Sequence, residues 1–340
     1  MSSAEATQSR AEGGDLVAAA RTGDEFAFSA LVERYRRELQ VHCYRMLGSY
    51  EDSEDLVQET FLRAWRKRKS FQGRSTFRAW LYGIATNACL DALKRRPRAV
   101  AAPGEAPALA EVPWLQPYPD RLLESIASSD DGPEGEIVAK ETIELAYIAA
   151  IQLLPPRQRA VLISRDVLGW SAAESASLLG VSVAAVNSAL QRARATLKRH
   201  LPRHRLDWAP GSAPSEEERA LLQLYMDAME RGDPAAMIDL LREDALCAMP
   251  PSPTWWVGRE AVVASWVEGG FGSDSWGHLK CVTTRVNGQP AVACYLRRPG
   301  ECEYRALVID VLRIEDRKFA EITGFPLEPL LEALGLPQTL

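Results

Sequence analysis

The sequence predicts a multidomain protein in which two all-α modules precede a C-terminal α+β domain. First, its 340 residues exceed the length of one ordinary domain. Second, apolar residues recur at three- and four-residue steps over most of the first two thirds, the period of amphipathic helices. Third, strand-like runs and an Asn287-Gly288 hairpin signal follow two further helices in the last third. A composition of 46% hydrophobic and 25% charged residues is that of a globular protein.

The predicted organisation follows shifts in composition along the chain. A polar N-terminus is expected to be disordered, and two stretches rich in Ala, Pro, Gly, Asp or Ser are expected to be linkers. The expected parts are residues 1–14 (disordered), 15–98 (first helical module), 99–135 (linker), 136–205 (second helical module), 206–214 (short linker) and 215–340 (α+β domain).

The first helical module carries a basic block in a chain whose net charge is −6. Between Phe61 and Arg98 there are eleven lysines and arginines against one acid, Asp91. Positive charge on helices that bear aromatic rings suits a phosphate backbone with unstacked bases. A solvated basic face is the simpler alternative for a charge run taken alone.

The helices of this module have distinct faces. Residues 15–48 carry an apolar stripe, and the next helix places Leu56, Val57, Phe61, Ala64 and Trp65 on one face. The opposite face offers polar residues, namely Asp55, Gln58, Glu59 and Arg63. A loop over residues 71–75 follows, and Ser75 or Thr76 is expected to cap the helix after it.

The second helical module has the pattern of a helix-turn-helix. Ser171 and Glu174 form a predicted capping box, Gly180 makes the turn, and Ser182 caps the last helix. An apolar face in that helix is expected to be buried (Val183, Val186, Leu190, Ala193, Leu197). The outer face presents groups suited to base edges and phosphates (Asn187, Ser188, Gln191, Arg192, Arg194, Lys198, Arg199).

Longer motifs in both modules carry a family resemblance. The run Glu54–Phe61 with Trp65, Phe77, Trp80, Leu81, Ile84, Ala85, Asn87, Asp91 and Lys94–Arg96 resembles region 2 of the extracytoplasmic-function (ECF) group of bacterial sigma-70 factors. The lead-in Leu153–Arg159 and the opening Trp170-Ser171-x-x-Glu174 resemble sigma region 4, which binds the −35 element.

This resemblance implies core RNA polymerase and promoter DNA as partners, and no catalytic residue, cofactor or metal. The implied polymerase-binding residues are Asp55, Gln58, Glu59 and Arg63. The implied −10 residues are Phe71, Gln72, Arg74, Arg78, Asn87, Lys94, Arg95 and Arg96. The implied −35 residues are Ser182, Asn187, Ser188, Gln191, Arg192, Arg194 and Lys198. Plain helix surface is the alternative for Asn187 and Ser188.

The first linker contains an apolar island at residues 113–120. Trp114, Leu115 and Pro117 are expected to dock on a folded surface, because exposed apolar side chains gain free energy from burial. An inert proline-rich spacer is the alternative.

The C-terminal domain has a different character, with 12 basic and 21 acidic residues from Asp207 onward. Its strand-like runs, expected at 246–249, 279–286, 291–297, 304–314 and 319–323, indicate a curved antiparallel sheet. The pattern resembles the SnoaL-like, nuclear-transport-factor-2-like cone fold, whose interior holds a pocket for an as yet unknown small ligand. Candidate pocket residues are Trp255, Trp256, Trp266, His278 and Tyr295, for which plain core is the alternative, and an acid–base pair of His278 with Asp310 is a minor one.

Several classes of protein are disfavoured. The N-terminus has no apolar signal segment, and no apolar run approaches about 20 residues, so the expected location is the bacterial cytoplasm, away from membranes. The six cysteines show no C-x-x-C spacing and are expected to be reduced.

The leading hypothesis is a sigma factor that its C-terminal domain regulates in cis. The alternatives are a helix-turn-helix regulator with a small-molecule-sensing domain, and an isomerase or hydrolase with a DNA-binding appendage. An anti-sigma partner is left open.

Overall fold

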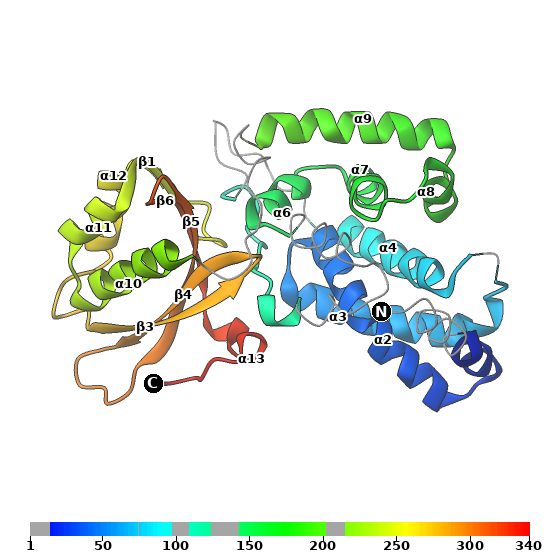
Figure 1. The fold of residues 1–340 in the computed structure, drawn as a ribbon, viewed down its shortest axis with the longest axis horizontal. Helices are drawn as coiled ribbons and strands as arrows, with labels where there is room; N and C mark the ends of the chain where they lie inside the picture. The colour runs from blue at the N-terminus through cyan, green and yellow to red at the C-terminus, as the bar shows by residue number, and fades with distance from the viewer. Residues whose placement is uncertain (1–13, 74, 97–108, 124–142, 202–214) are drawn as a thin grey trace. The chain divides into compact units, whose positions relative to one another are not determined.

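The computed structural model describes residues 14–73, 75–96, 109–123, 143–201 and 215–340. They form two compact units, one helical and one built around a sheet (Figure 1). The helical unit contains the first predicted helical module and residues 150–201 of the second. The second unit contains the C-terminal domain together with residues 109–121 and 143–149. Each unit is described by itself.

The first half of the helical unit consists of a helix at residues 14–22 and the longer helices α2 (Glu25–Leu47), α3 (Tyr50–Lys67) and α4 (Phe77–Arg95). A 3-10 turn, η1 (Arg68–Ser70), ends α3. Each long helix begins at a capping side chain, because the first N–H groups of a helix need acceptors. Asp24, Ser49 and Thr76 accept these hydrogen bonds, so Thr76 rather than Ser75 caps α4.

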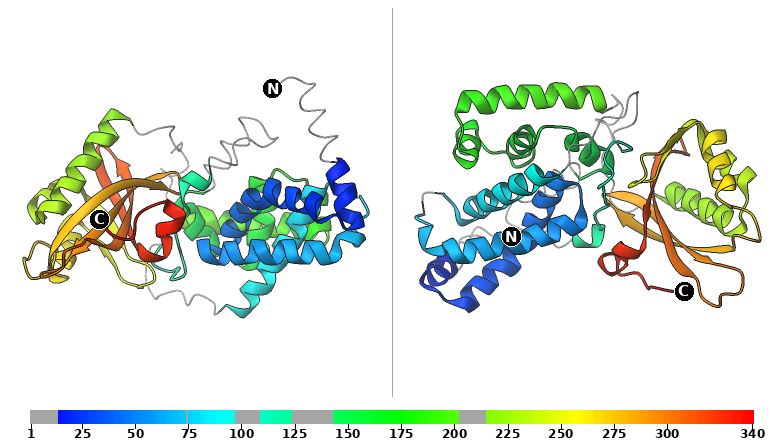
Figure 2. Two further views of the ribbon diagram at one scale, coloured as in Figure 1. Left: turned by 90° about the horizontal axis from the view of Figure 1, so that it is seen from below. Right: turned by 180° about the vertical axis from the view of Figure 1, so that it is seen from behind.

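The second half contains α7 (Pro156–Leu162), a π-helical turn η3 (Ile163–Val167), α8 (Ala172–Leu179) and α9 (Val183–His200). The capping box at Ser171 and Glu174 is confirmed, and so is the turn at Gly180, which takes the left-handed conformation at φ 63°. Ser182 caps α9, which packs against α7 and α8 (Figures 1 and 2). Val183 was expected in the buried face, but it is 44% exposed because it lies at the first residue of α9, beyond the helices that cover the rest.

The two halves pack together within the helical unit. The guanidinium of Arg159 on α7 is buried and donates to carbonyl oxygens of both halves, including that of Met46 on α2. The rings of Tyr82 on α4 and Trp170, just before α8, meet edge-on with centroids 5.6 Å apart. The helix α6 (Leu145–Gln152) begins in the sheet unit and ends in the helical unit.

The second unit is built on a six-stranded sheet of order β2-β1-β6-β5-β4-β3. Its strands are β1 (Leu241–Ala248), β2 (Trp255–Val257), β3 (His278–Val286), β4 (Gln289–Arg297), β5 (Arg305–Glu315) and β6 (Lys318–Pro326). The hairpin at Asn287-Gly288 is confirmed between β3 and β4. The expected all-antiparallel sheet is wrong in one place, because β1 pairs with β6 in parallel. The strand β1 also begins five residues before the expected run, and β2 was not expected as a strand.

Three helices cover one face of this sheet (Figure 1). They are α10 (Glu216–Arg231), α11 (Pro234–Leu240) and α12 (Arg259–Glu268). A capping box at Ser215 and Glu218 opens α10, and Asp233 caps α11. A short 3-10 turn, η5 (Glu328–Leu330), and α13 (Leu331–Leu334) follow the last strand.

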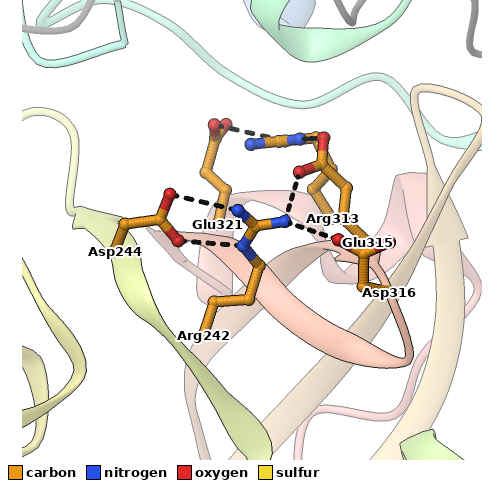
Figure 3. A network of polar contacts seen from close by, with 6 residues as sticks. All are labelled: Arg242, Asp244, Arg313, Glu315, Asp316 and Glu321. Atoms are coloured by element: carbon orange, nitrogen blue, oxygen red, sulfur yellow. Dashed lines mark hydrogen bonds and ion pairs between the residues drawn. The ribbon is translucent and has the colours of Figure 1, made fainter.

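A network of ion pairs joins β1 to the turn between β5 and β6 (Figure 3). Arg242 bonds the carboxylates of Asp244, Glu315 and Asp316 at 2.9–3.2 Å. Arg313 pairs with Glu315 and, at 3.5 Å, with Glu321. The turn itself requires positive φ at Asp316 and Arg317 (50° and 62°), so the network fastens a strained segment to the neighbouring parallel strand.

The apolar island of the first linker belongs to the sheet unit. The backbone of Tyr118 exchanges hydrogen bonds with Asn287 in the β3–β4 turn, at 2.7 Å to its Oδ1 and 2.9 Å from its N–H. Asp120, in the 3-10 turn η2 (Asp120–Leu122), accepts from the N–H of Gly288 at 2.8 Å, and Arg121 donates to the carbonyl of Ala333 at the end of α13. Residues 99–108 and 124–135 of the predicted linker lie outside the described residues.

Candidate polymerase and nucleic-acid interfaces

The candidate polymerase-binding residues lie on α3, on the side away from its buried face. Asp55 and Gln58 are exposed, while Glu59 and Arg63 are half-buried and form an ion pair at 2.7 Å. Arg63 also lies 3.6 Å from Asp91 of α4. Leu62, next to them, is 52% exposed. This face therefore presents an exposed carboxylate (Asp55), an exposed amide (Gln58), the Glu59–Arg63 ion pair and the apolar side chain of Leu62.

The candidate −10 loop precedes α4 and is built on stacked aromatic rings. Phe71 packs against Phe77 and Trp80 with ring centroids 5.5 and 5.4 Å apart. All three rings are half-buried, and Gln72 beside them is exposed. Arg74 lies outside the described residues. Partly exposed rings next to an open loop provide a surface on which a base can stack.

The candidate −10 residues of α4 and of its C-cap, Arg96, divide into two groups. Arg78 holds Glu38 of α2 through its Nε at 3.0 and 3.1 Å, and Arg96 holds Asp52 and the carbonyl of Leu47. Both guanidiniums therefore join helices in this structure. A second group is exposed: Asn87, whose amide caps the Gly83 carbonyl at 2.8 Å, Lys94, paired with Asp91, and Arg95.

The outer face of α9 presents one continuous polar stripe. Asn187, Gln191, Arg194 and Lys198 are spaced by four, three and four residues, which at about 100° per residue places them on one line along the helix. All four are exposed. Arg194 makes a two-pronged ion pair with Asp166 of the π-helical turn, at 2.6 and 2.9 Å.

The other candidate −35 residues lie apart from this stripe. The Ser182 hydroxyl accepts from the N–H of Ala185, so it serves the helix cap. Ser188 is exposed on α9 but lies outside the stripe, because it is one residue, or about 100° around the helix, from Asn187. Arg192 lines a cleft of about 700 Å³ between α4 and the helices of the second half. Asn87 and Lys94 of the −10 set line the same cleft.

The candidate pocket residues of the sheet unit do not converge on one cavity within the described residues. Trp255 and Trp256 lie on β2 at one edge of the sheet, and His278 begins β3 at the other edge. Trp266 packs on the core from α12, and the buried Tyr295 donates its hydroxyl to the carbonyl of Pro337 at 2.8 Å. His278 lines a small hollow of about 70 Å³ near Glu230 and Trp276.

The structure separates His278 from Asp310. His278 pairs with Arg297 and Asp310 with Val292, positions five residues apart on β4 and thus about 17 Å along the strand. Asp310 instead lies in the core, where Tyr225 of α10 donates to it at 3.0 Å. Burial raises the pKa of its carboxyl to about 6, although the bonds from Tyr225 and Cys294 oppose this shift.

Two buried polar groups have surroundings that the sequence did not indicate. Arg159 entered only as part of a motif, and Asp310, named only as a partner of His278, is surrounded instead by Tyr225, Cys294 and Cys281. Cys281 and Cys294 are six positions from the hairpin turn on either side, so the predicted hairpin register contained a signal for their pairing. No group of three or more His, Cys, Asp or Glu side chains within the described residues is arranged so that it could hold a metal ion.

Comparison with known proteins assigns the class of each part. Residues 31–99 match the model of Sigma-70 region 2, residues 144–197 that of Sigma-70, region 4, and residues 222–322 that of the SnoaL-like domain. The protein is therefore a sigma-type helical pair joined to a SnoaL-like domain.

The relatives narrow this class. The chain is 41% identical to the ECF RNA polymerase sigma factor SigG of Mycobacterium tuberculosis (strain ATCC 25618 / H37Rv), over 94% of this chain and 86% of SigG. It is 32% identical to SigM of the same strain over 55% of this chain and 83% of SigM. The chain belongs to the ECF RNA polymerase sigma factors. The crystal structure of M. tuberculosis SigJ has the same fold, with a TM-score of 0.58 and 22% identity over 91% of this chain and 99% of SigJ.

Among the described residues, no single helix has the length and apolar content to cross a membrane. Two consecutive helices, α8 and α9, are together long and apolar enough for a span, but the chain bends by 100° between them.

Proposed function

We propose that this chain is a promoter-specificity subunit that binds core RNA polymerase, recognises the −10 and −35 elements and promotes initiation. The exposed stripe on α9 carries this proposal, because it sits on the second helix of a helix-turn-helix with its polar groups free of the core. Initiation by such a subunit is a binding process: it requires base-edge and phosphate contacts but no nucleophile on this chain.

The residue roles follow from exposure and existing partners. Asn187 and Gln191 are assigned to base edges and Lys198 to phosphate. Phe71, Gln72, Asn87, Lys94 and Arg95 are assigned to the melted −10 strand. Arg78 and Arg96 are proposed to act on DNA only indirectly, by holding α4 against its neighbours. Asp55, Gln58 and the Glu59–Arg63 ion pair, with the exposed Leu62, are assigned to the polymerase.

The sheet unit is proposed to regulate these functions in cis. Support comes from residues 109–121, which lie between the two helical modules in the sequence and are bonded to the β3–β4 turn. Leu115 and Pro117 are buried there and Trp114 is half-buried. A tethered domain acts at an effective concentration that can reach millimolar, so even weak contacts with the helical modules would matter.

Run-off transcription with purified core polymerase and a panel of promoters tests the sigma function. Core-dependent initiation on a subset of promoters is expected. Specific DNA binding without any core-dependent initiation would instead favour a helix-turn-helix regulator with a sensing domain.

A truncation tests the regulatory role. Deleting residues 212–340 is expected to change initiation strongly in either direction, and Trp114→Ala with Leu115→Ala to reproduce part of that change. Thr283→Ala, an exposed site on β3, is a matched control. Equal rates and equal core affinity for the truncated and full-length chains would contradict regulation in cis.

A further inference from the structure

The sheet unit contains a cluster of thiols around a buried carboxylate. Cys281 on β3 and Cys294 on β4 are direct partners in the strand register, and their Sγ atoms are 3.5 Å apart. The Cys294 Sγ lies 3.9 Å from Oδ2 of Asp310, the atom that also accepts from Tyr225. Promoter recognition and polymerase binding use none of these groups.

The backbone at this pair has the geometry that a disulfide needs. The N–H of Cys281 donates to Glu230 of α10 at 2.9 Å, so it does not point toward β4. The pair is therefore of the non-hydrogen-bonded type, in which Cα atoms lie about 4.5 Å apart. Disulfides span Cα separations of about 4.4–6.8 Å, so side-chain rotation can bring the sulfurs to about 2.05 Å without separating the strands.

The two thiols differ in their access to solvent. Cys281 is half-buried on β3, which is an edge strand, whereas Cys294 is fully buried on the next strand. The hydrogen bond with Cys281 and burial raise the pKa of the Cys294 thiol well above its ordinary value. Since oxidants react with accessible thiolates, Cys281 is the thiol that meets a peroxide.

Asp310 is placed to take a proton from the second thiol. It is buried beside Cys294, and the raised pKa of about 6 leaves it mostly ionised at neutral pH. The hydroxyl of Tyr225 holds the carboxylate in position from α10. A carboxylate within reach of an otherwise unreactive thiol is the arrangement of a general base.

We propose that Cys281 and Cys294 form a peroxide-oxidised dithiol with Asp310 as the proton acceptor. In the first step the Cys281 sulfur attacks the terminal oxygen of a hydroperoxide and the O–O bond breaks. The Cys281 thiol proton passes to the departing oxygen, giving a sulfenic acid and an alcohol or water. In the second step the Cys294 sulfur attacks the Cys281 sulfur and the S–O bond breaks. The Cys294 proton passes through Asp310 to the departing hydroxide, which leaves as water. The two thiols lose two electrons, and these reduce the peroxide.

The test uses the reduced full-length protein and hydrogen peroxide, followed by alkylation and peptide mapping by mass spectrometry. We expect a single Cys281–Cys294 disulfide that dithiothreitol reverses. The buried pair Cys43 and Cys89, whose thiols also interact, and the exposed Cys302 serve as internal controls and should form no disulfide at limiting peroxide. A disulfide at the control pair with the same yield, or an unmodified Cys281, would overturn the proposal.

Three variants separate the steps. Cys294→Ser should stop at the Cys281 sulfenic acid, which dimedone labels, and Cys302→Ser should react as the wild type. Asp310→Asn should slow disulfide closure by about tenfold or more while leaving sulfenic acid formation within about twofold. Closure at the wild-type rate in Asp310→Asn would remove Asp310 from the reaction. If a variant loses hydrogen-exchange protection in β3 and β4, the wild-type map alone decides.

Discussion

Arg159 on α7 is bonded to both the carbonyl and the side chain of Gln152, and Gln152 is in turn bonded to α2. The Arg159 Nη2 donates to the Gln152 carbonyl at 2.7 Å, and the Gln152 amide donates to the carbonyl of Arg45 at 3.1 Å. The guanidinium of Arg159 donates to uncharged oxygens of Ile151, Met46, Gln152 and Leu154. Burial, followed by the charge of Arg96, lowers the Arg159 pKa to about 9. The two residues fasten the second helical module to the first.

Removing this guanidinium should weaken the helical unit. Arg159→Met is expected to lower its free energy of unfolding by about 2–4 kcal/mol, because several buried carbonyls lose their donor. Arg157→Met, at an exposed position of the same helix, should change it by less than about 0.5 kcal/mol. Hydrogen exchange at α7 amides, recorded as a function of urea concentration, measures the unfolding free energy of both variants. Equal stability of the two variants would show that Arg159 is not needed for the contact.

Acid should destabilise the helical unit through His42. Its ring is buried against Thr86, with 2.9 Å between Nε2 and Oγ1, and burial followed by the charge of Arg45 lowers its pKa to about 3. The unfolded chain then binds more protons between pH 6.5 and 3, so stability is full above 6.5 and falls as pH falls. The slope reaches about 1.4 kcal/mol per pH unit.

His42→Gln should remove this slope, whereas His200→Gln, at the exposed end of α9, should keep it. The measurement is hydrogen exchange of α2 amides in the intact chain from pH 7 to pH 5. An unchanged slope in His42→Gln would assign the acid sensitivity to other groups.

Polymerase binding should depend on the acidic face of α3. Asp55→Arg with Glu59→Arg is expected to weaken binding to core polymerase by at least about tenfold, because it places positive charge against a basic partner surface. Glu25→Arg with Glu33→Arg makes the same charge change on exposed positions of α2 and should bind as the wild type. Surface-based titration against core polymerase distinguishes the pairs, and an equal loss in both would indicate a general charge effect.

Residues of the polar stripe on α9 should have two different roles, with some setting sequence specificity and others setting overall DNA affinity. Gln191→Ala is expected to relax preference at one −35 position by about 1–3 kcal/mol. Lys198→Ala should instead weaken all promoters evenly and lower the salt dependence by about one counterion. Selection from a randomised −35 library at two salt concentrations measures both. The same preferred sequence for wild type and Gln191→Ala would show that the side chain does not read a base.

The linker should be released when its anchor on the β3–β4 turn is lost. Asn287 is buried, and its side chain bonds the backbone of Tyr118 and Ile143 at 2.7 and 2.6 Å. Asn287→Ala is therefore expected to raise the rate of proteolytic cleavage within residues 109–123 by at least about tenfold, while Thr283→Ala leaves it unchanged. Limited proteolysis of the full chain decides, and intact resistance in Asn287→Ala would mean that apolar burial alone holds the segment.

Features that depend on residues within one turn were predictable from sequence. The capping boxes at Ser171 and Ser215, the turn at Gly180 and the hairpin at Asn287-Gly288 each rest on hydrogen bonds or backbone preferences spanning at most four residues. The same is true of the polar stripe on α9, which follows from helical periodicity once the helix is assigned. The assignment to sigma regions 2 and 4 was also predictable from sequence, because it depends on ordered runs of motif residues and not on tertiary contacts.

Features that join distant segments were decided by the tertiary structure. The sequence by itself determined that α4 is basic, yet only packing directs Arg78 and Arg96 to carboxylates on α2 and α3 and leaves Lys94 and Arg95 exposed. The parallel pairing of β1 with β6 and the contact of Cys294 with Asp310 likewise depend on which strands become neighbours. The physical reason is that a cap or a turn lowers the free energy locally. The partner of a buried charge or thiol, by contrast, is set by the packing of the whole unit around it.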